Sequence, residues 1–447
     1  MHTERVRRTF LRGRAGHQER TTHLGRQGFS KVIEKEPRFV RIVVTTTTNQ
    51  QNEVLMQLIT FHDETGALLQ VDVGQLYATF GRVPDYRQAR GKRYSLAYLL
   101  TVICLAKLAG EHKPAAIAEW IQLRGSLLAR LLGVSGLATP SLNTIGRTLA
   151  SAVSAAELQQ ACRRFLRQAY GAEQANLVVL DGKTLRGTIP KGASQGVHLL
   201  AAYVPDDGLV LDQEAVDGKE NEIPAAVRLL ARLNLRRRVV GADALLTQRD
   251  IARQIRRQGG DYVFYAKDNQ RHLLADIRCL FSLRPARPGW FRHALPATVA
   301  TTVDKQHGRL ERRTLTLIPD ADGFLDWPGA CQVFRLQRHT TTITTGRVRQ
   351  ETVYGLTSLP PATCDAQRLL HLTRSFWSIE NGLHYRRDVT LQEDATRMHH
   401  RNQAASMATL NNFVVGLLSM LGFTNFASAQ RRFADGLMRT LMALLFL

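Results

Sequence analysis

The feature of this sequence that most constrains its fold is a change of periodicity near residue 176. From there, short β-branched and apolar runs alternate with amphipathic segments. Strands are predicted at 176–181, 197–204, 209–216, 239–242 and 262–266, and helices at 222–233 and 249–258. Three strands, a helix, a strand, a helix and a strand predict an α/β domain.

Two acidic residues stand at the ends of predicted strands. Asp181 ends the apolar run of the first strand, and Asp243 follows the fourth strand directly. This order of elements, with acids at these two places, is that of a ribonuclease H-like core, which carries its third acid on a later helix. Glu380, in the helix-like segment 377–381, is the candidate for that place, and Glu393 is the alternative.

Three carboxylates on neighbouring elements can hold two magnesium ions. Mg²⁺ prefers carboxylate oxygens, and two ions about 3.5 to 4 Å apart can activate a water or hydroxyl and stabilise the leaving oxygen. Asp181 would bridge both ions, because a buried strand holds its end rigidly. An acid at a strand end is more often an ordinary turn residue, so the prediction depends on the joint positions. We expect Mg²⁺ as the cofactor, with Mn²⁺ as a substitute.

The charge of the chain indicates a polyanionic partner. Its 447 residues include 60 Lys and Arg against 38 Asp and Glu, which gives a formal net charge of +22. Most contacts between proteins and DNA are made to the backbone, so polar residues near strand ends and in basic loops are candidates. Ordinary surface polarity is the alternative explanation. The predicted DNA contacts are Lys183, Arg186, Lys219, Asn221, Lys267, Asn269, Arg387, Arg93 and Arg147.

The pattern divides the chain into four parts. Residues 1–56 form a basic arm that is predicted to be disordered, 57–170 an all-α helical domain, 171–425 the α/β catalytic domain, and 426–447 a C-terminal helix. A β-rich insertion is predicted at about 284–361, with strand-like runs at 314–318, 332–336 and 352–356.

Within the all-α domain, four helices are predicted, at 96–108, at 117–132, after Pro140 with Ser141 as the N-cap, and at 155–169. Such short helices fit a helix-turn-helix reader of the major groove, or a plain helical bundle.

Two classes of protein are not favoured. The five cysteines include no Cys-x-x-Cys pair, which predicts free thiols rather than a zinc knuckle or a disulfide framework. The apolar stretches 96–109 and 407–423 are interrupted by Lys107, Asn411 and Asn412, which predicts buried helices rather than membrane spans. We expect a bacterial cytoplasmic protein that associates with the nucleoid.

An ordered series of sequence blocks carries a specific resemblance. It runs from Pro84-Asp85 and 91–94, through Asp181-Gly-Lys-Thr-Leu-Arg-Gly187, 219–223, 241–244, 260–263, 267–270 and 307–311, to Ile379-Glu-Asn-Gly-Leu-His384 and 388–394. Over about 76–412, the chain resembles the H-repeat-associated group of bacterial insertion-sequence transposases. The resemblance implies a DDE transposase with an amino-terminal associated helical domain. By matching, the metal-binding triad would be Asp181, Asp243 and Glu380.

The wider signature around the last acid is met only in part. Some related transposases have a Tyr seven residues before the Glu, an Arg four before it and a Lys seven after it. Thr373, Phe376 and Arg387 stand at these positions here.

These observations predict a transposase that binds the terminal inverted repeats of its element. It would cleave DNA strands with Mg²⁺ and join the freed 3′ hydroxyl to target DNA, as a homo-oligomer that brings two ends together. Two alternatives have the same fold. One is a catalytically inactive or domesticated sequence-specific DNA-binding protein, and the other is a ribonuclease H-like nuclease or resolvase that acts on branched DNA.

Overall fold

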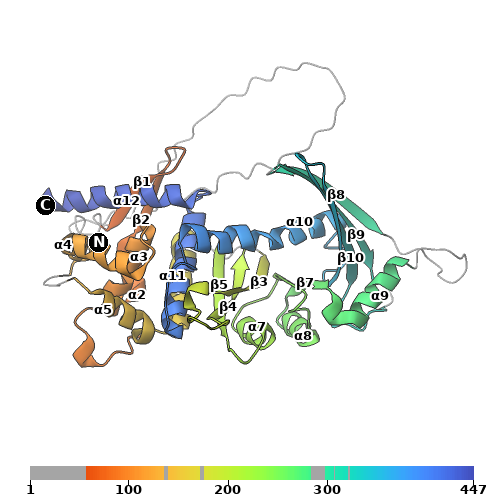
Figure 1. The fold of residues 1–447 in the computed structure, drawn as a ribbon, viewed down its shortest axis with the longest axis horizontal. Coiled ribbons are helices and arrows are strands. Elements are labelled where there is room, and N and C mark those ends of the chain that lie inside the picture. The colour runs from red at the N-terminus through yellow and green to blue at the C-terminus, as the bar shows by residue number, and fades with distance from the viewer. Residues whose placement is uncertain are drawn as a thin grey trace, which may run out of the picture. The chain divides into compact units, whose positions relative to one another are not determined.

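A long twisted sheet organises the part of the chain described by the computed structural model (Figure 1). That part comprises residues 57–134, 139–171, 176–282, 297–306, 308–320 and 323–446. The arm predicted at 1–56 lies outside it. Among the described residues, the sheet has nine strands in the order β5-β4-β3-β6-β7-β11-β10-β9-β8.

The first half of the sheet contains the strands that the periodicity predicts. They are β3 (Leu177–Thr184), β4 (His198–Val204), β5 (Leu209–Val216), β6 (Val239–Ala242) and β7 (Asp261–Ala266). The first three are antiparallel neighbours, whereas β6 runs parallel to β3 and β7 runs parallel to β6. Helix α7 (Glu222–Ala231) leads into β6, and α8 (Arg249–Arg257) leads into β7. The predicted order and the mixed α/β class are confirmed.

The second half of the sheet is an antiparallel meander that joins the first half directly. It consists of β8 (Thr298–Gln306), β9 (Arg309–Pro319), β10 (Gln332–Thr342) and β11 (Val348–Thr357), and β11 pairs antiparallel with β7. Three of these strands contain the predicted strand-like runs, but β8 was not predicted. Helix α9 (Arg271–Ser282) lies between β7 and β8 in the chain.

Helices cover both faces of the first half of the sheet. Figure 1 shows α10 (Ala366–Phe376) on one side and α7 and α8 on the other. The contact with α10 is close, because a Cβ atom at Gly241 in β6 would overlap the ring of Phe376. A glycine in the middle of this strand therefore makes room for the helix.

The amino-terminal described segment begins with a hairpin, so the prediction of an all-α domain is wrong there. Strands β1 (Leu58–His62) and β2 (Leu68–Asp72) pair antiparallel. The turn between them is stabilised by the Asp63 carboxylate, which accepts hydrogen bonds from the backbone N–H groups of Thr65 and Ala67, both at 2.8 Å. Such short strands carry little periodic signal, and the turn chemistry of Asp63 was the available clue.

Of the helices that follow, the first was not predicted, and the others agree with the prediction. They are α2 (Val73–Phe80), α3 (Leu96–Leu108), α4 (Pro114–Leu131), α5 (Leu142–Arg147) and α6 (Ala155–Tyr170). Ser141 caps α5 by accepting the backbone N–H of Thr144 at 3.3 Å, as predicted. Every residue of α3 is buried. No helix among the described residues is long and apolar enough to cross a membrane, and the five cysteines are free thiols.

The last two helices connect the helical part with the sheet. Helix α11 (Arg401–Met420) packs against α3 and α6 on one side and β5 on the other (Figure 1), and α12 (Phe426–Ala443) packs against β1, α3 and α4. The contact with β5 includes buried hydrogen bonds, because the Gln213 amide donates to Thr409 Oγ1 at 2.7 Å and accepts from Asn412 at 2.8 Å. Short turns complete the fold, namely η1 (Ala89–Gly91), η2 (Thr148–Ala152), η3 (Arg186–Thr188), η4 (Asp268–Gln270) and η7 (Leu444–Phe446).

Candidate active site

Asp181 and Asp243 lie side by side because their strands are parallel neighbours. Leu180 on β3 pairs with Ala242 on β6, and the two acids are the next residues on each strand. Neighbouring strands are about 4.8 Å apart, so the carboxylates lie close together at this place, which we call the acidic edge. Asp243 follows the last residue of β6 as predicted, whereas β3 continues past Asp181 to Thr184.

The surroundings of Asp243 disfavour its negative charge. Partial desolvation raises the pKa of Asp243, and the negative charges of Glu222 and Asp181 raise it further. A hydrogen bond from the backbone N–H of Leu246 to Asp243, at 3.2 Å, acts in the opposite direction. Asp243 nevertheless keeps a solvent-exposed surface. A cation at this edge would relieve the repulsion between the acids.

Glu222 is an acid of this region that the sequence reasoning missed. It is the first residue of α7, and its Oε1 lies 2.8 Å from Nε2 of His198. The His198 Nδ1 lies in turn 2.7 Å from Thr184 Oγ1. A Cβ atom at Gly182 would overlap the Glu222 carboxylate, so this acid lies directly against the residue after Asp181. A sequence signal existed, because the block 219–223 opens the helix after the third strand.

The segment after α10 reaches the acidic edge through a buried histidine. It forms two π-helical turns, η5 (Glu380–His384) and η6 (Arg386–Thr390). The His384 side chain is 7% exposed, and its Nε2 lies 3.1 Å from Oδ2 of Asp181. Neither ring nitrogen forms a hydrogen bond with a described residue. Glu380 is exposed and lies four residues before His384 on the same turn.

Glu393, the alternative third acid, lies in the protein interior. Its Oε2 accepts a hydrogen bond from Nε of Arg387 at 2.8 Å, and Nη2 of Arg387 lies at 2.8 Å as well. The Asn411 amide donates to Oε1 at 2.7 Å. Both charged side chains are 1% exposed. The structure therefore contradicts two predictions, because Glu393 is not placed to bind a metal at the acidic edge and Arg387 is not placed to contact DNA.

The donor set of the acidic edge suits a hard divalent cation. Carboxylate oxygens are the ligands that Mg²⁺ prefers, and Asp181 and Asp243 supply them from adjacent strands. Within the described ranges, however, no three His, Cys, Asp or Glu residues are arranged as a formed metal site. The chemistry of the donors fits the ion, whereas the carboxylates do not form a closed cage.

Lys183, a predicted DNA contact, forms ion pairs within the protein instead. Its Nζ lies 2.7 Å from Oδ1 of Asp388 and 3.2 Å from Oδ1 of Asp394, and its side chain is 10% exposed. These pairs connect β3 to η6 and to the segment that follows it. Arg186 is 80% exposed and lies 3.7 Å from Asp394, so its guanidinium remains accessible to DNA.

Two of the predicted polar contacts stabilise loops around the acidic edge. Asn221 caps α7 by accepting the N–H of Ile223 at 3.0 Å. Asn269 donates to the carbonyl of Ala244 at 2.6 Å, which holds the loop that follows Asp243. Both asparagines are also exposed.

The remaining predicted DNA contacts are exposed basic residues. Lys219 precedes α7 and Lys267 follows β7. Arg93 lies with its guanidinium carbon 5.8 Å from the centre of the Tyr94 ring. On α5, Arg147 donates from Nε to the carbonyl of Asn143 at 3.2 Å.

Comparison with known families identifies the part of the chain that contains this site. A model described as a transposase DDE domain matches residues 173–417, and a second, described as DDE_Tnp_1-associated, matches residues 77–166. The chain belongs to the transposase DDE domain family. The match covers Asp181, Asp243 and Glu380.

Individual relatives agree with the family. The chain is 27% identical over 345 residues to the H repeat-associated putative transposase YhhI of Escherichia coli (strain K12). This match covers 75% of this chain and 88% of YhhI. It is 32% identical over 258 residues to an uncharacterized protein in the dhlA 3′ region of Xanthobacter autotrophicus. That match covers 56% of this chain and 83% of the Xanthobacter protein. The predicted resemblance to the H-repeat-associated group is thus confirmed.

Among solved structures, a chain of the piggyBac transposase synaptic complex with hairpin DNA can be aligned with this protein. The alignment covers 88% of this chain and 78% of the piggyBac complex chain. The TM-score is 0.38 and the sequence identity is 9%.

Proposed function

We propose that this DDE-family protein is the transposase of a bacterial insertion sequence. It would cleave DNA at the terminal inverted repeats of its element and join the freed 3′ hydroxyls to target DNA, with Mg²⁺ or Mn²⁺. The observation that carries the proposal is the side-by-side position of Asp181 and Asp243 on parallel strands. The strand order around them, β5-β4-β3-β6-β7, supports a ribonuclease H-like core.

The chain's own residues have distinct roles in this proposal. Asp181 and Asp243 would hold the metal, and Glu380 is the proposed third ligand, one helical turn from the histidine that contacts Asp181. The metal, when bound, activates the attacking oxygen and stabilises the leaving oxygen. His384 approaches Asp181 from the interior and would hold its carboxylate in a fixed orientation. Glu222 would add negative charge at the same edge.

DNA would contact the protein around this edge and in the helical part. The exposed side chains of Arg186, Lys219 and Lys267 surround the ends of the catalytic strands and would bind phosphates. We propose 57–170 as the associated DNA-binding domain and 171–425 as the catalytic domain. Helix α12, in the remaining segment, packs against β1, α3 and α4 of the first domain. Two copies would act together, because two element ends must meet before strand transfer.

The test is nicking of a labelled duplex that carries the element's end and its flanking DNA, in Mg²⁺ or Mn²⁺. We expect the wild type to cut at the end, and both Asp181→Asn and Asp243→Asn to lose cutting. Asp250→Asn is the matched control, because Asp250 is an exposed aspartate on α8 that forms an ion pair with Arg253 at 2.7 Å. Normal cutting by either acidic-edge variant would refute the proposed site.

One observation favours a second candidate, a DNA-binding protein that no longer cleaves. Within the described ranges, no three potential ligands form a ready metal site. Tight binding of end DNA by the wild type, without nicking in either metal, would establish this candidate in place of the transposase.

A further inference from the structure

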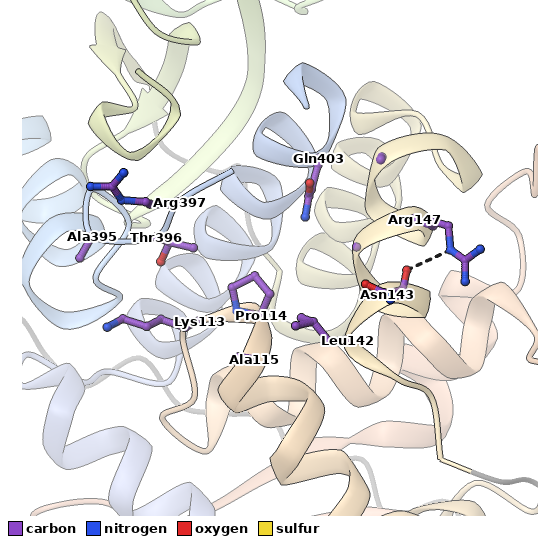
Figure 2. A pocket seen from close by; sticks show the side chains of 12 residues that line it. Lys113, Pro114, Ala115, Leu142, Asn143, Arg147, Ala395, Thr396, Arg397 and Gln403 are labelled. Atoms are coloured by element: carbon purple, nitrogen blue, oxygen red, sulfur yellow. Dashed lines mark hydrogen bonds between the residues drawn. The ribbon is translucent and has the colours of Figure 1, made fainter. Parts of the chain in front are cut away.

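A groove separate from the acidic edge lies where the helical part meets the segment after Glu393. It has a volume of about 910 Å³. The start of α4, helix α5, residues 395–397 and the start of α11 line it (Figure 2). The groove therefore joins elements from the two segments that match the two family models.

The charged residues that line this groove are all basic. They are Lys113, Arg147 and Arg397, and among the described residues no Asp or Glu lines the groove. Figure 2 shows Lys113 and Arg397 on one side of the groove and Arg147 on the other. The side chains of Lys113 and Arg397 are exposed, and neither forms a hydrogen bond or an ion pair with another described residue. We call this feature the basic groove.

Two helices begin at the basic groove. Helix α4 starts at Pro114 and α11 starts at Arg401. In the described structure, the side chain of the residue before each helix, Lys113 or His400, does not cap its first backbone N–H groups. Pro114, Ala115 and Gln403, from the first turns of these helices, line the groove. Uncapped N–H groups and the positive end of the helix dipole favour phosphate. Helix geometry and side-chain charge thus favour the same kind of ligand.

One wall of the groove is attached to η3, the turn that directly follows the strand carrying Asp181. The backbone N–H of Met398 donates to the carbonyl of Gly187 at 3.3 Å, and the N–H of Arg186 donates to Asp394 Oδ1 at 3.1 Å. A Cβ atom at Gly187 would overlap the carbonyl oxygen of Thr396, so the two backbones are in direct contact. The backbone that carries Arg397 therefore has a fixed position relative to the end of β3.

We propose that the basic groove binds the phosphodiester backbone of the DNA duplex that the acidic edge cleaves. The identity of the duplex rests on the proposed function, whereas the preference for phosphate follows from the groove itself. Lys113 and Arg397 contact phosphates from one wall, and the first turns of α4 and α11 supply N–H donors. Because the other wall belongs to α5, the groove also fixes the helical domain on the same DNA.

The test compares two double variants that each remove two positive charges. Lys113→Gln with Arg397→Gln neutralises the groove. Arg257→Gln with Lys305→Gln is the matched control, because both residues are exposed and belong to α8 and β8, which do not line the groove. Binding of a fluorescein-labelled duplex with the element's flanking DNA is measured by anisotropy in EDTA over a series of salt concentrations.

The expected result is a smaller salt dependence for the groove variant alone. Each lost phosphate contact makes the negative slope of log K against log salt shallower by about 0.9. The slope of the double variant should therefore be shallower by about 1.8 than that of the wild type. The charge-preserving variant Lys113→Arg with Arg397→Lys should restore the slope, which distinguishes lost contacts from misfolding. Equal slopes for the groove and control variants would overturn the proposal.

The experiment also separates this proposal from the proposed function, because binding is measured without metal. If the wild type binds DNA through the groove but never nicks it, the proposal that the groove binds DNA is supported and the proposed transposase activity is refuted. A wild type that nicks at the ends, with a groove variant that binds like the control, would refute the groove alone.

Discussion

Replacing Glu393 with glutamine is expected to destabilise the fold without weakening metal binding. The Glu393 carboxylate has two Arg387 nitrogens at 2.8 Å and the Asn411 amide at 2.7 Å, in a site where both charged side chains are 1% exposed. Glutamine would leave the guanidinium buried without a counter-charge. Removal of one partner from a buried ion pair costs about 3 to 5 kcal/mol.

Urea denaturation followed by tryptophan fluorescence measures this loss. Glu380→Gln is the matched control, because it makes the same chemical change on an exposed residue and should leave the unfolding midpoint unchanged. The double variant Arg387→Met with Glu393→Met should recover most of the loss, since apolar replacement of a whole buried pair is often neutral.

The reasoning would be refuted by the opposite pattern. If Glu393→Gln unfolded at the wild-type midpoint but bound Mn²⁺ more weakly in calorimetry, Glu393 would be a ligand and not an interior partner of Arg387. If the double variant were no more stable than Glu393→Gln, the unpaired Arg387 guanidinium would not be the cause of the lost stability.

Two further predictions concern other charged groups. Burial lowers the pKa of Lys107 from 10.5 to about 8, so between these pH values the unfolded state binds more protons than the folded state. The free energy of unfolding should therefore rise with pH across this window, and Lys107→Met should remove the rise in urea denaturation at each pH. At the acidic edge, Glu222→Gln should weaken Mn²⁺ binding about tenfold in calorimetry, whereas Glu220→Gln, in the same block but paired with Arg228 at the surface, should not. Equal affinities for these two variants would show that Glu222 is remote from the metal.

Much of the fold could be predicted because its elements have strong periodicity. The strands β3 to β7 and the helices α3 to α8 are marked by apolar spacing that local sequence reveals. Strand β8 was missed because most of its residues are exposed and polar, and it is stabilised by pairing with β9. The pairing of β11 with β7 depends on contacts between distant residues, which periodicity does not report.

In the candidate site, only the neighbouring positions of the two acids at strand ends could be predicted from the sequence. The adjacency of Asp181 and Asp243 follows from the parallel register, which the order of elements implied. Charged residues are usually exposed, so Lys183 and Arg387 were assigned to DNA. Lys183 instead pairs with Asp388, which lies nearby only in the folded chain. Arg387 pairs with Glu393, six residues further on, and local sequence does not reveal that this pair is buried. His384 reaches Asp181 from more than two hundred residues away, a contact that no local pattern contains.

The packing of α11 matters for deciding which copies of such an element still encode an active protein. This helix follows the last candidate acid and packs against α3 and α6 on one side and β5 on the other. A gene interrupted near codon 400 would retain Asp181, Asp243 and Glu380, yet its product would expose the apolar surfaces that α11 covers. A genome survey that scores copies by their acids alone would count this gene as intact. An uninterrupted reading frame through residue 420 is therefore a better mark of a working copy.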